Sequence, residues 1–284
     1  SSIIKRYHHY KADGLIEFTT FHQSYSYEEF IEGIRPVMTS DSDNVISDVK
    51  YKVSSGLFKN FCDRAKQSIQ TNHVFIIDEI NRGNISRIFG ELITLIEESK
   101  RKGEADERSV ILPYSGLPFS VPSNVYIIGT MNTADRSIAL LDTALRRRFS
   151  FVEMMPDTEV LKDIKIEVPE MPDTVDKKAG KSTIDIQKLL EIINQRIEVL
   201  YDREHTIGHA YFCGLKKTAT LDGLKNVFKK SVLPLLQEYF FDDYEKIAMV
   251  LGDNQKRNRN YKFIVEDNGK RYVIQEIKDK LVRS

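Results

Sequence analysis

Two adjacent carboxylates, Asp78 and Glu79, follow four large apolar residues in the stretch VFIIDEINRGN, residues 74–84. In open α/β sheets, ligands bind beyond the carboxyl ends of the strands, where a rigid sheet holds side chains toward solvent. An acid pair in that position suits nucleotide hydrolysis: one carboxylate helps to hold Mg²⁺ through water, and the other orients and deprotonates the attacking water. The alternative is that the acids cap the helix expected to begin near Asn84, although the gap is long for a cap.

A second apolar run, residues 125–129, predicts another buried strand, and it also ends in polar residues, Thr130 and Asn132. If the two strands are neighbours, Asn132 lies close to Glu79 and can hold the same water. Alone, an asparagine after a strand is usually turn chemistry. Together with the acid pair, it predicts one corner of a site.

Three consecutive arginines, Arg146, Arg147 and Arg148, lie at the end of the helix expected over residues 138–147 and directly before Phe149. Such a run is most often a solvated face. Arginine is also a permanently charged, bidentate donor to phosphate oxygens, and a helix end can present it to the active site of an adjacent subunit. An arginine supplied in this way raises the rate of phosphoryl transfer by a factor of about 10³ to 10⁵.

The elements that position these residues alternate between strands and helices, which predicts an α/β domain with a mostly parallel sheet. Short apolar runs and helical spacing of apolar residues mark them. We expect strands over residues 15–21, 74–77, 110–112, 118–121, 125–129 and 150–154, and helices over residues 27–34, 56–69, 84–101 and 138–147. The strand 74–77 should be buried on both faces, and 110–121 should form a hairpin.

After Pro156 the pattern becomes mainly helical. We expect helices over residues 184–200 and 221–239, with Pro234 as a kink, a loop over 167–182, and a hairpin over 262–275. These patterns predict three parts: an α/β core at residues 1–156, a mainly helical domain at 157–250, and a C-terminal hairpin and tail at 251–284.

The composition suits a soluble globular protein with a sizeable core: 284 residues, 41% hydrophobic, 30% charged and a formal net charge of zero. The net charge therefore gives no indication that the protein binds nucleic acid. Cys62 and Cys213 lie far apart without other metal ligands, which favours two reduced thiols. No apolar run approaches the roughly 20 residues that span a bilayer, and no signal peptide is visible, so we expect a cytoplasmic protein.

Several segments together resemble one family. VFIIDEINRGNISRIFGELITLIE (residues 74–97) is similar to the Walker B strand and following helix of AAA+ proteins, in the branch that includes MoxR-type and dynein-related ATPases. MNTADRS (131–137) matches a signature of the McrB family, the GTP-hydrolysing motor subunits of modification-dependent restriction systems. FTTFHQSYSYEEFIEGIRP (18–36) and HTIGHAYF (205–212) also resemble McrB segments.

The resemblance implies a role for each matching residue of the core. Asp78 would be the Mg²⁺-associated acid and Glu79 the catalytic base. Asn132 would be the sensor that helps to position the attacking water, and Asp135 and Arg136 would shape the same loop. The fold implied is an AAA+ core followed by a helical lid domain.

The resemblance also names residues outside that cluster. Arg147 and Arg148 are the candidates for the intersubunit arginine, and one of them can instead act within its own subunit. Gly208 and His209 would lie in a lid segment that closes on the nucleotide, although a Gly-His pair is more often a turn. The hairpin over residues 110–121 resembles an insertion that often points into the central pore of a ring.

One departure from the family pattern stands out: no G-x-x-x-x-G-K-[ST] occurs in the sequence. That loop cradles nucleotide phosphates with backbone N–H groups and a lysine. Residues 180–182, Gly-Lys-Ser, have the ending of the motif but neither its first glycine nor a preceding strand. In the family the loop lies N-terminal to the Phe18 segment, so we expect either a truncated chain or a natural loss. In both cases this polypeptide alone should bind nucleotide poorly.

Three functions remain open. The first is a McrB-like motor that uses Mg²⁺ and GTP, with ATP possible, forms a ring (expected to be a hexamer), and drives a McrC-like nuclease. Its DNA, modified with 5-methylcytosine, would be read by a separate domain or partner. The second is a MoxR-like or dynein-related ATPase that remodels proteins. The third is a degenerate AAA+ module that serves only assembly. The MNTADRS run favours the first.

Overall fold

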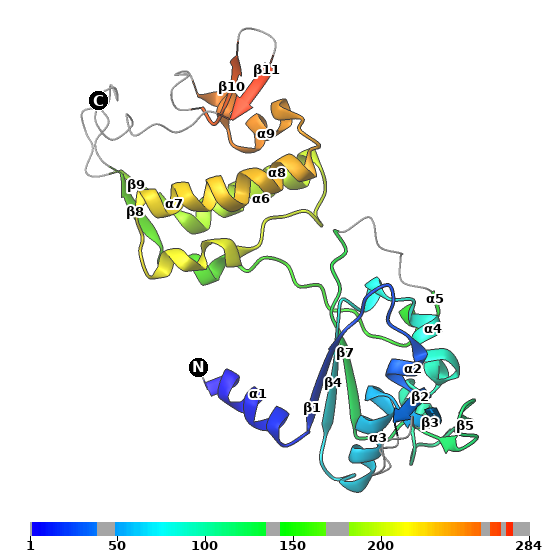
Figure 1. Ribbon diagram of the computed structural model, residues 1–284. Helices are drawn as coiled ribbons and strands as arrows, with labels where there is room; N and C mark the ends of the chain where they lie inside the picture. The colour runs from blue at the N-terminus through cyan, green and yellow to red at the C-terminus, as the bar shows by residue number, and fades with distance from the viewer. Residues whose placement is uncertain are drawn as a thin grey trace, which may run out of the picture. The chain divides into compact units, whose positions relative to one another are not determined.

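The computed structural model describes residues 2–38, 49–134, 143–168, 182–256, 262–267 and 271–274. Contacts divide the chain into two compact units, Ser1–Phe151 and Val152–Ser284 (Figure 1). The domain boundaries expected at residues 156 and 250 stay predictions. Within the described ranges, no helix is long and apolar enough to cross a membrane.

A parallel sheet of three strands forms the centre of the first unit, in the order β1–β4–β7 (Figure 1). β1 is Ile16–Thr20, β4 is His73–Asp78 and β7 is Val125–Gly129. Ile77 near the end of β4 pairs with Gly129 at the end of β7. Parallel pairing brings the carboxyl ends of these strands to one edge of the sheet, as the sequence predicted.

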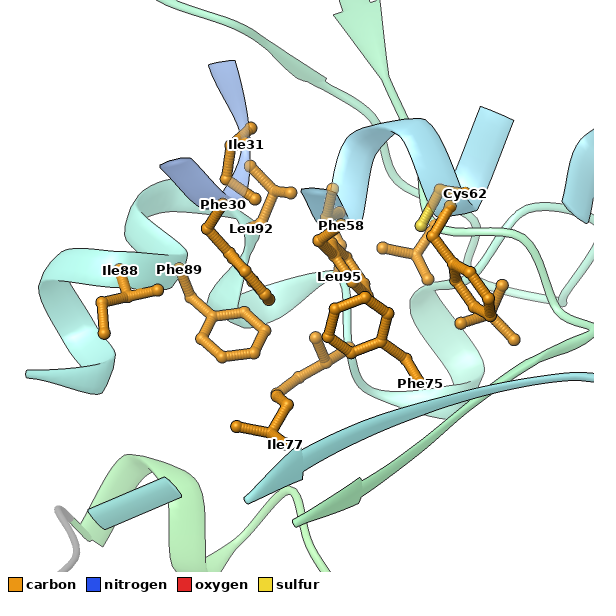
Figure 2. Close-up of a cluster of buried hydrophobic side chains, with 14 of the residues drawn as sticks. Phe30, Ile31, Phe58, Cys62, Phe75, Ile77, Ile88, Phe89, Leu92 and Leu95 are labelled. Carbon is orange, nitrogen blue, oxygen red and sulfur yellow. The ribbon is translucent and has the colours of Figure 1, made fainter. Parts of the chain in front are cut away.

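One face of the sheet packs against helices α3 (Leu57–Gln67) and α4 (Ile85–Phe89). Phe75 and Ile77 of β4 are fully buried and project into this core, as Figure 2 shows. Their buried neighbours, from these helices and from the segments beside them, include Phe30, Phe58, Phe61, Ile88, Phe89, Leu92 and Leu95. Val74 and Ile76 alternate with them and are only half-buried, so the expectation that β4 is buried on both faces is wrong.

The opposite face of the sheet carries exposed apolar side chains. Phe18, Tyr126 and Ile128 are 41%, 48% and 51% exposed, respectively. Phe18, Ile76 and Ile128 form one row across the three strands. Apolar side chains gathered on a sheet face normally pack against another layer, so this face, which we call the bare face, is ready to receive one.

The outer edge of β7 is also open, because no other described strand pairs with it. The strand expected over residues 150–154 does not form, and Phe151, Val152 and Met154 are exposed. A strand needs a partner for its backbone N–H and C=O groups. Without one beside it, the apolar run stays irregular.

Two helices are shorter than their apolar patterns predicted. The helix expected over 27–34 ends early: α2 is Tyr27–Phe30, and β2 (Glu32–Met38) then pairs with β3 (Val49–Ser55) in an antiparallel ribbon. Ile31 accepts a hydrogen bond from Gly56 N at 2.6 Å, which closes the base of this ribbon. Cross-strand pairing therefore outweighs the local helical pattern.

The helix expected over 84–101 breaks at Gly90. α4 ends at Phe89, and 3₁₀ turns follow over Gly90–Thr94 and Glu98–Lys100. Gly90 has φ +52°, a conformation that side chains disfavour, and the Tyr27 ring would lie 3.1 Å from an added Cβ. The apolar stripe is nevertheless buried as expected, through Ile85, Ile88, Phe89, Leu92 and Ile96.

The predicted hairpin near residue 115 is confirmed: β5 (Val110–Ile111) pairs with β6 (Pro118–Phe119). Its turn is fixed by Glu32, which is 1% exposed. Glu32 Oε1 accepts hydrogen bonds from Tyr114 N at 3.0 Å and from Ser115 N at 2.8 Å. The unit also contains α1 (Ser2–Ala12) and α5 (Thr143–Arg146).

The second unit is mainly helical and has a core of its own. Its helices are α6 (Ile186–Leu200), α7 (Leu221–Val227), α8 (Leu233–Tyr239) and α9 (Tyr244–Val250). A π-helical turn over Phe228–Val232 precedes Pro234, which has no N–H to donate to the preceding turn. Two antiparallel pairs complete it: β8 (Lys165–Val168) with β9 (Ser182–Asp185), and β10 (Ile264–Asp267) with β11 (Arg271–Ile274).

Candidate functional site

Thr130 ties the carboxyl ends of β4 and β7 together. Its backbone N–H donates to Ile77 O and its carbonyl accepts from Ile80 N, both at 2.9 Å. Its hydroxyl donates to Asp78 Oδ1 at 2.5 Å, and Thr130 Oγ1 in turn accepts from Glu79 N at 3.4 Å. The acid pair therefore lies directly against the residue that follows the neighbouring strand.

Glu79 has a backbone conformation that is uncommon outside glycine, with φ +53° and ψ +45°. Its side chain turns toward Arg82, and Glu79 Oε2 lies 3.1 Å from Arg82 Nε. This oxygen is buried, and the contact lacks the alignment of a hydrogen bond. Uncommon backbone conformations of this kind gather at functional sites, which makes Glu79 a candidate for chemistry.

Asn132 lies beside the turn that follows the acid pair. Its backbone carbonyl accepts from Asn81 Nδ2 at 3.4 Å, and its Oδ1 accepts from Ala134 N at 3.1 Å. The side-chain oxygen therefore serves the turn, while Nδ2 makes no hydrogen bond to the described residues and is available to hold a water. Asp135 and Arg136 lie outside the described residues.

The two candidate arginines have different surroundings. Arg148 is 16% exposed, and its Nε lies 2.9 Å from Glu97 Oε1 in the same unit. Arg147 is exposed just beyond the end of α5. The structure thus separates a residue bound within its own unit from one that is accessible to another molecule.

Gly208 and His209 lie in the second unit, where they begin a 3₁₀ helix over His209–Lys216. Asp157 N donates to His209 Nδ1 at 3.0 Å. An added Cβ at Gly208 would meet nothing within 4 Å. These contacts describe a turn, and the role of the pair in closing on a nucleotide stays a prediction.

Comparison with known proteins identifies the family. Residues 2–149 match the AAA domain of the dynein-related subfamily, and residues 185–248 match the alpha-helical lid domain of McrB. The chain is a McrB-type AAA+ protein. It is similar to the Type IV methyl-directed restriction enzyme EcoKMcrB subunit of Escherichia coli K12, with 42% identity over 246 residues that cover 82% of this chain and 49% of the relative.

A second relative is more distant. The chain is 27% identical over 248 residues to the Type II restriction enzyme BsuMI component YdiS of Bacillus subtilis 168, which covers 78% of this chain and 69% of the relative. The chain spans about half the length of the E. coli relative. The AAA and lid matches confirm the predicted fold, an α/β core followed by a helical lid domain.

McrB-type AAA+ homology implies a nucleotide and Mg²⁺ in general. The described residues contain no group of three or more His, Cys, Asp or Glu side chains that could enclose a metal by themselves. Mg²⁺ usually keeps several waters and is held by one or two carboxylates together with substrate phosphates. Asp78 at the strand end fits that kind of site, in which the ion arrives with the nucleotide.

Sequence reasoning placed the acid pair and Asn132 together but assigned no role to three of their neighbours. Thr130 was visible as a polar residue at a strand end. Arg82 and Asn81 lie in the same stretch as the acids, residues 74–84, but only the 3₁₀ turn over Ile80–Arg82 shows which way they face. Asn81 Oδ1 is buried and accepts no hydrogen bond from the part of the chain that the structure describes.

Proposed function

We propose that this protein is the nucleoside-triphosphatase motor of a McrBC-like restriction system and that it hydrolyses GTP, with ATP as the alternative nucleotide. The observation that carries the proposal is the meeting of Asp78, Glu79 and Thr130 at the aligned ends of β4 and β7. The names of both relatives, one a subunit and one a component of a restriction enzyme, support the class of system.

Each residue of the site has a proposed task. Asp78 helps to hold Mg²⁺, which supplies positive charge to the phosphates when bound. Glu79 orients the attacking water and accepts its proton, and Nδ2 of Asn132 positions the same water. Arg147, which is exposed, reaches the phosphates in a neighbouring subunit.

The phosphates also need a cradle, and we propose that a segment outside these 284 residues supplies it. A phosphate-binding P-loop is built as strand, glycine-rich loop and helix. The open edge of β7 offers a pairing site for such a strand, and the bare face with Phe18, Tyr126 and Ile128 offers an apolar seat for such a helix. This chain alone should therefore bind nucleotide poorly.

The role proposed for Arg147 requires that subunits assemble with one another. We propose that subunits form a ring, a hexamer in the simplest case, in which Arg147 of one subunit completes the site of the next. A McrC-like nuclease would be the partner of the ring, and a separate domain or partner would read DNA that carries 5-methylcytosine. The lid segment with Gly208 and His209 would close on the nucleotide.

The test is hydrolysis of GTP and of ATP by the full-length protein with Mg²⁺, in wild type and in Glu79→Gln. We expect Glu79→Gln to retain nucleotide binding and to lose about 10² to 10⁴-fold in turnover, the range for removing a general base. Glu104→Gln, which changes an exposed acid outside the site, is the matched control. Unchanged turnover in Glu79→Gln would remove Glu79 as the base.

The match to the dynein-related AAA subfamily favours a second candidate, an ATPase that remodels proteins. It predicts preference for ATP over GTP and no stimulation by a nuclease subunit. A module that serves only assembly is the third reading, and it predicts that the complete reading frame also lacks a Gly-Lys-Ser/Thr loop. Hydrolysis of either nucleotide by wild type excludes it.

A further inference from the structure

We propose that Thr130 is a positioning residue that orients Asp78 for the metal ion, an inference that rests on the hydrolytic function proposed above. Thr130 follows β7, whereas the acids follow β4, so the contact joins two strands that are 52 residues apart in sequence at this point. No local pattern places this hydroxyl on the carboxylate. Only the parallel pairing of β4 with β7 does so.

The hydroxyl of Thr130 has one proton, and the structure shows where it goes. Oγ1 lies 2.5 Å from Asp78 Oδ1, a short distance typical of a hydroxyl that donates to a carboxylate. The hydrogen bond holds the Asp78 side chain in one rotamer and occupies one of its two oxygens. The other carboxylate oxygen accepts no hydrogen bond from the described residues, so it remains for a water or an ion.

The same hydroxyl also faces the second acid. Its oxygen accepts from Glu79 N at 3.4 Å, a weak contact to a residue with φ +53°. A single side chain therefore touches the carboxylate of Asp78 and the backbone that turns Glu79 away from the strand. Side chains that orient metal-binding carboxylates in this way typically change metal affinity or activity by 10- to 100-fold when removed.

The backbone of Thr130 does a separate, structural job. Its N–H and C=O groups bond to Ile77 and Ile80 and hold the strand ends together. Valine at this position would keep both backbone hydrogen bonds, the β-branched shape and the preference for extended structure, and would lose only the hydroxyl. Serine would keep the hydroxyl and lose the methyl group. The two variants therefore separate orientation of Asp78 from local packing.

The experiment measures Mn²⁺ binding to the full-length protein by electron paramagnetic resonance, with a non-hydrolysable GTP analogue present. We expect Thr130→Val to weaken Mn²⁺ binding by about tenfold or more, and Thr130→Ser to stay within about threefold of wild type. Thr94→Val removes an exposed hydroxyl that bonds Glu91 O, away from the acids, and should leave Mn²⁺ affinity unchanged. Binding of the analogue in EDTA should be equal in all four proteins.

Wild-type Mn²⁺ affinity in Thr130→Val overturns the proposal, and so does an equal loss in Thr130→Val and Thr130→Ser, because that result assigns the effect to packing. Loss of analogue binding in EDTA in Thr130→Val also overturns it. The hydrolysis assay judges the proposed function separately. If wild type hydrolyses nothing but Thr130→Val still weakens Mn²⁺ binding selectively, the role of Thr130 stands while the motor function falls.

Discussion

Arg148 Nε and Glu97 Oε1 lie 2.9 Å apart, and this ion pair joins the end of α5 to the segment that follows α4. The Arg148 side chain is 16% exposed and that of Glu97 is 35% exposed, so the pair is only partly shielded from solvent. Arg147, its neighbour in the chain, is exposed. Two adjacent arginines therefore have different surroundings: Arg148 pairs within its own unit, and Arg147 is accessible to another molecule.

The ion pair of Arg148 with Glu97 should contribute to the free energy of unfolding only while both side chains are present. Arg148→Ala and Glu97→Ala should each lower the free energy of unfolding, and the double variant should show a coupling of about 1 kcal/mol. Urea denaturation of the four proteins measures this coupling, with Arg146→Ala as an exposed control. Additive effects of the two substitutions would show that the ion pair contributes nothing.

Arg147→Ala should leave the unfolding free energy within about 0.5 kcal/mol of wild type and lower turnover by about 10³-fold or more. The hydrolytic activity of mixed Glu79→Gln and Arg147→Ala subunits is the sharper measurement. Glu79→Gln subunits retain Arg147, so next to an Arg147→Ala subunit they complete a site with an intact acid pair. Mixtures of the two inactive variants should therefore regain activity, and inactive mixtures would place Arg147 within its own subunit.

The contact between Asp202 and His205 in the second unit predicts that the free energy of unfolding falls at acidic pH. Asp202 Oδ1 lies 2.6 Å from His205 Nδ1, and His205 is 5% exposed between the rings of Tyr201 and Tyr239. Burial acts to raise the pKa of Asp202, but hydrogen bonds from the His205 side chain and backbone outweigh it and lower that pKa below its usual 3.8.

A lowered pKa means that the folded state favours the carboxylate. The stabilisation by Asp202 is therefore complete above pH 3.8 and is lost as the pH falls through its lower folded-state pKa. Asp202→Asn should lower the unfolding free energy at neutral pH, and its difference from wild type should shrink below pH 3.8. Asp222→Asn, at an exposed aspartate, should show no such convergence in denaturant titrations across this range.

The sequence was informative where short-range patterns decide the structure. The apolar runs that became β4 and β7 were recognised because they are short, apolar and followed by polar residues. Their parallel pairing followed from the alternation of strands and helices, and it brought Asp78 and Glu79 against Thr130. The meeting of the two strand ends could therefore be predicted, whereas the contact of Thr130 with Asp78 was not, and the water shared by Glu79 and Asn132 stays a prediction.

Contacts between distant segments decided the rest. The Tyr27 ring lies against Gly90, where α4 ends, and the contact of Arg148 with Glu97 depends on how α5 meets a 3₁₀ turn. The apolar run 150–154 looks like a strand in sequence, but a strand also needs a neighbour with free backbone groups. Neither a residue type nor a spacing carries that information.

Glu32 sits at the base of the β2–β3 ribbon and binds the tip of the β5–β6 hairpin through one carboxylate oxygen. A mechanical load applied at that tip would therefore be transmitted to the ribbon through two N–H···O contacts, because the carboxylate is a rigid bridge between them. The β2–β3 ribbon and the β5–β6 hairpin are therefore mechanically coupled. Neither can move independently unless the two hydrogen bonds to Glu32 break.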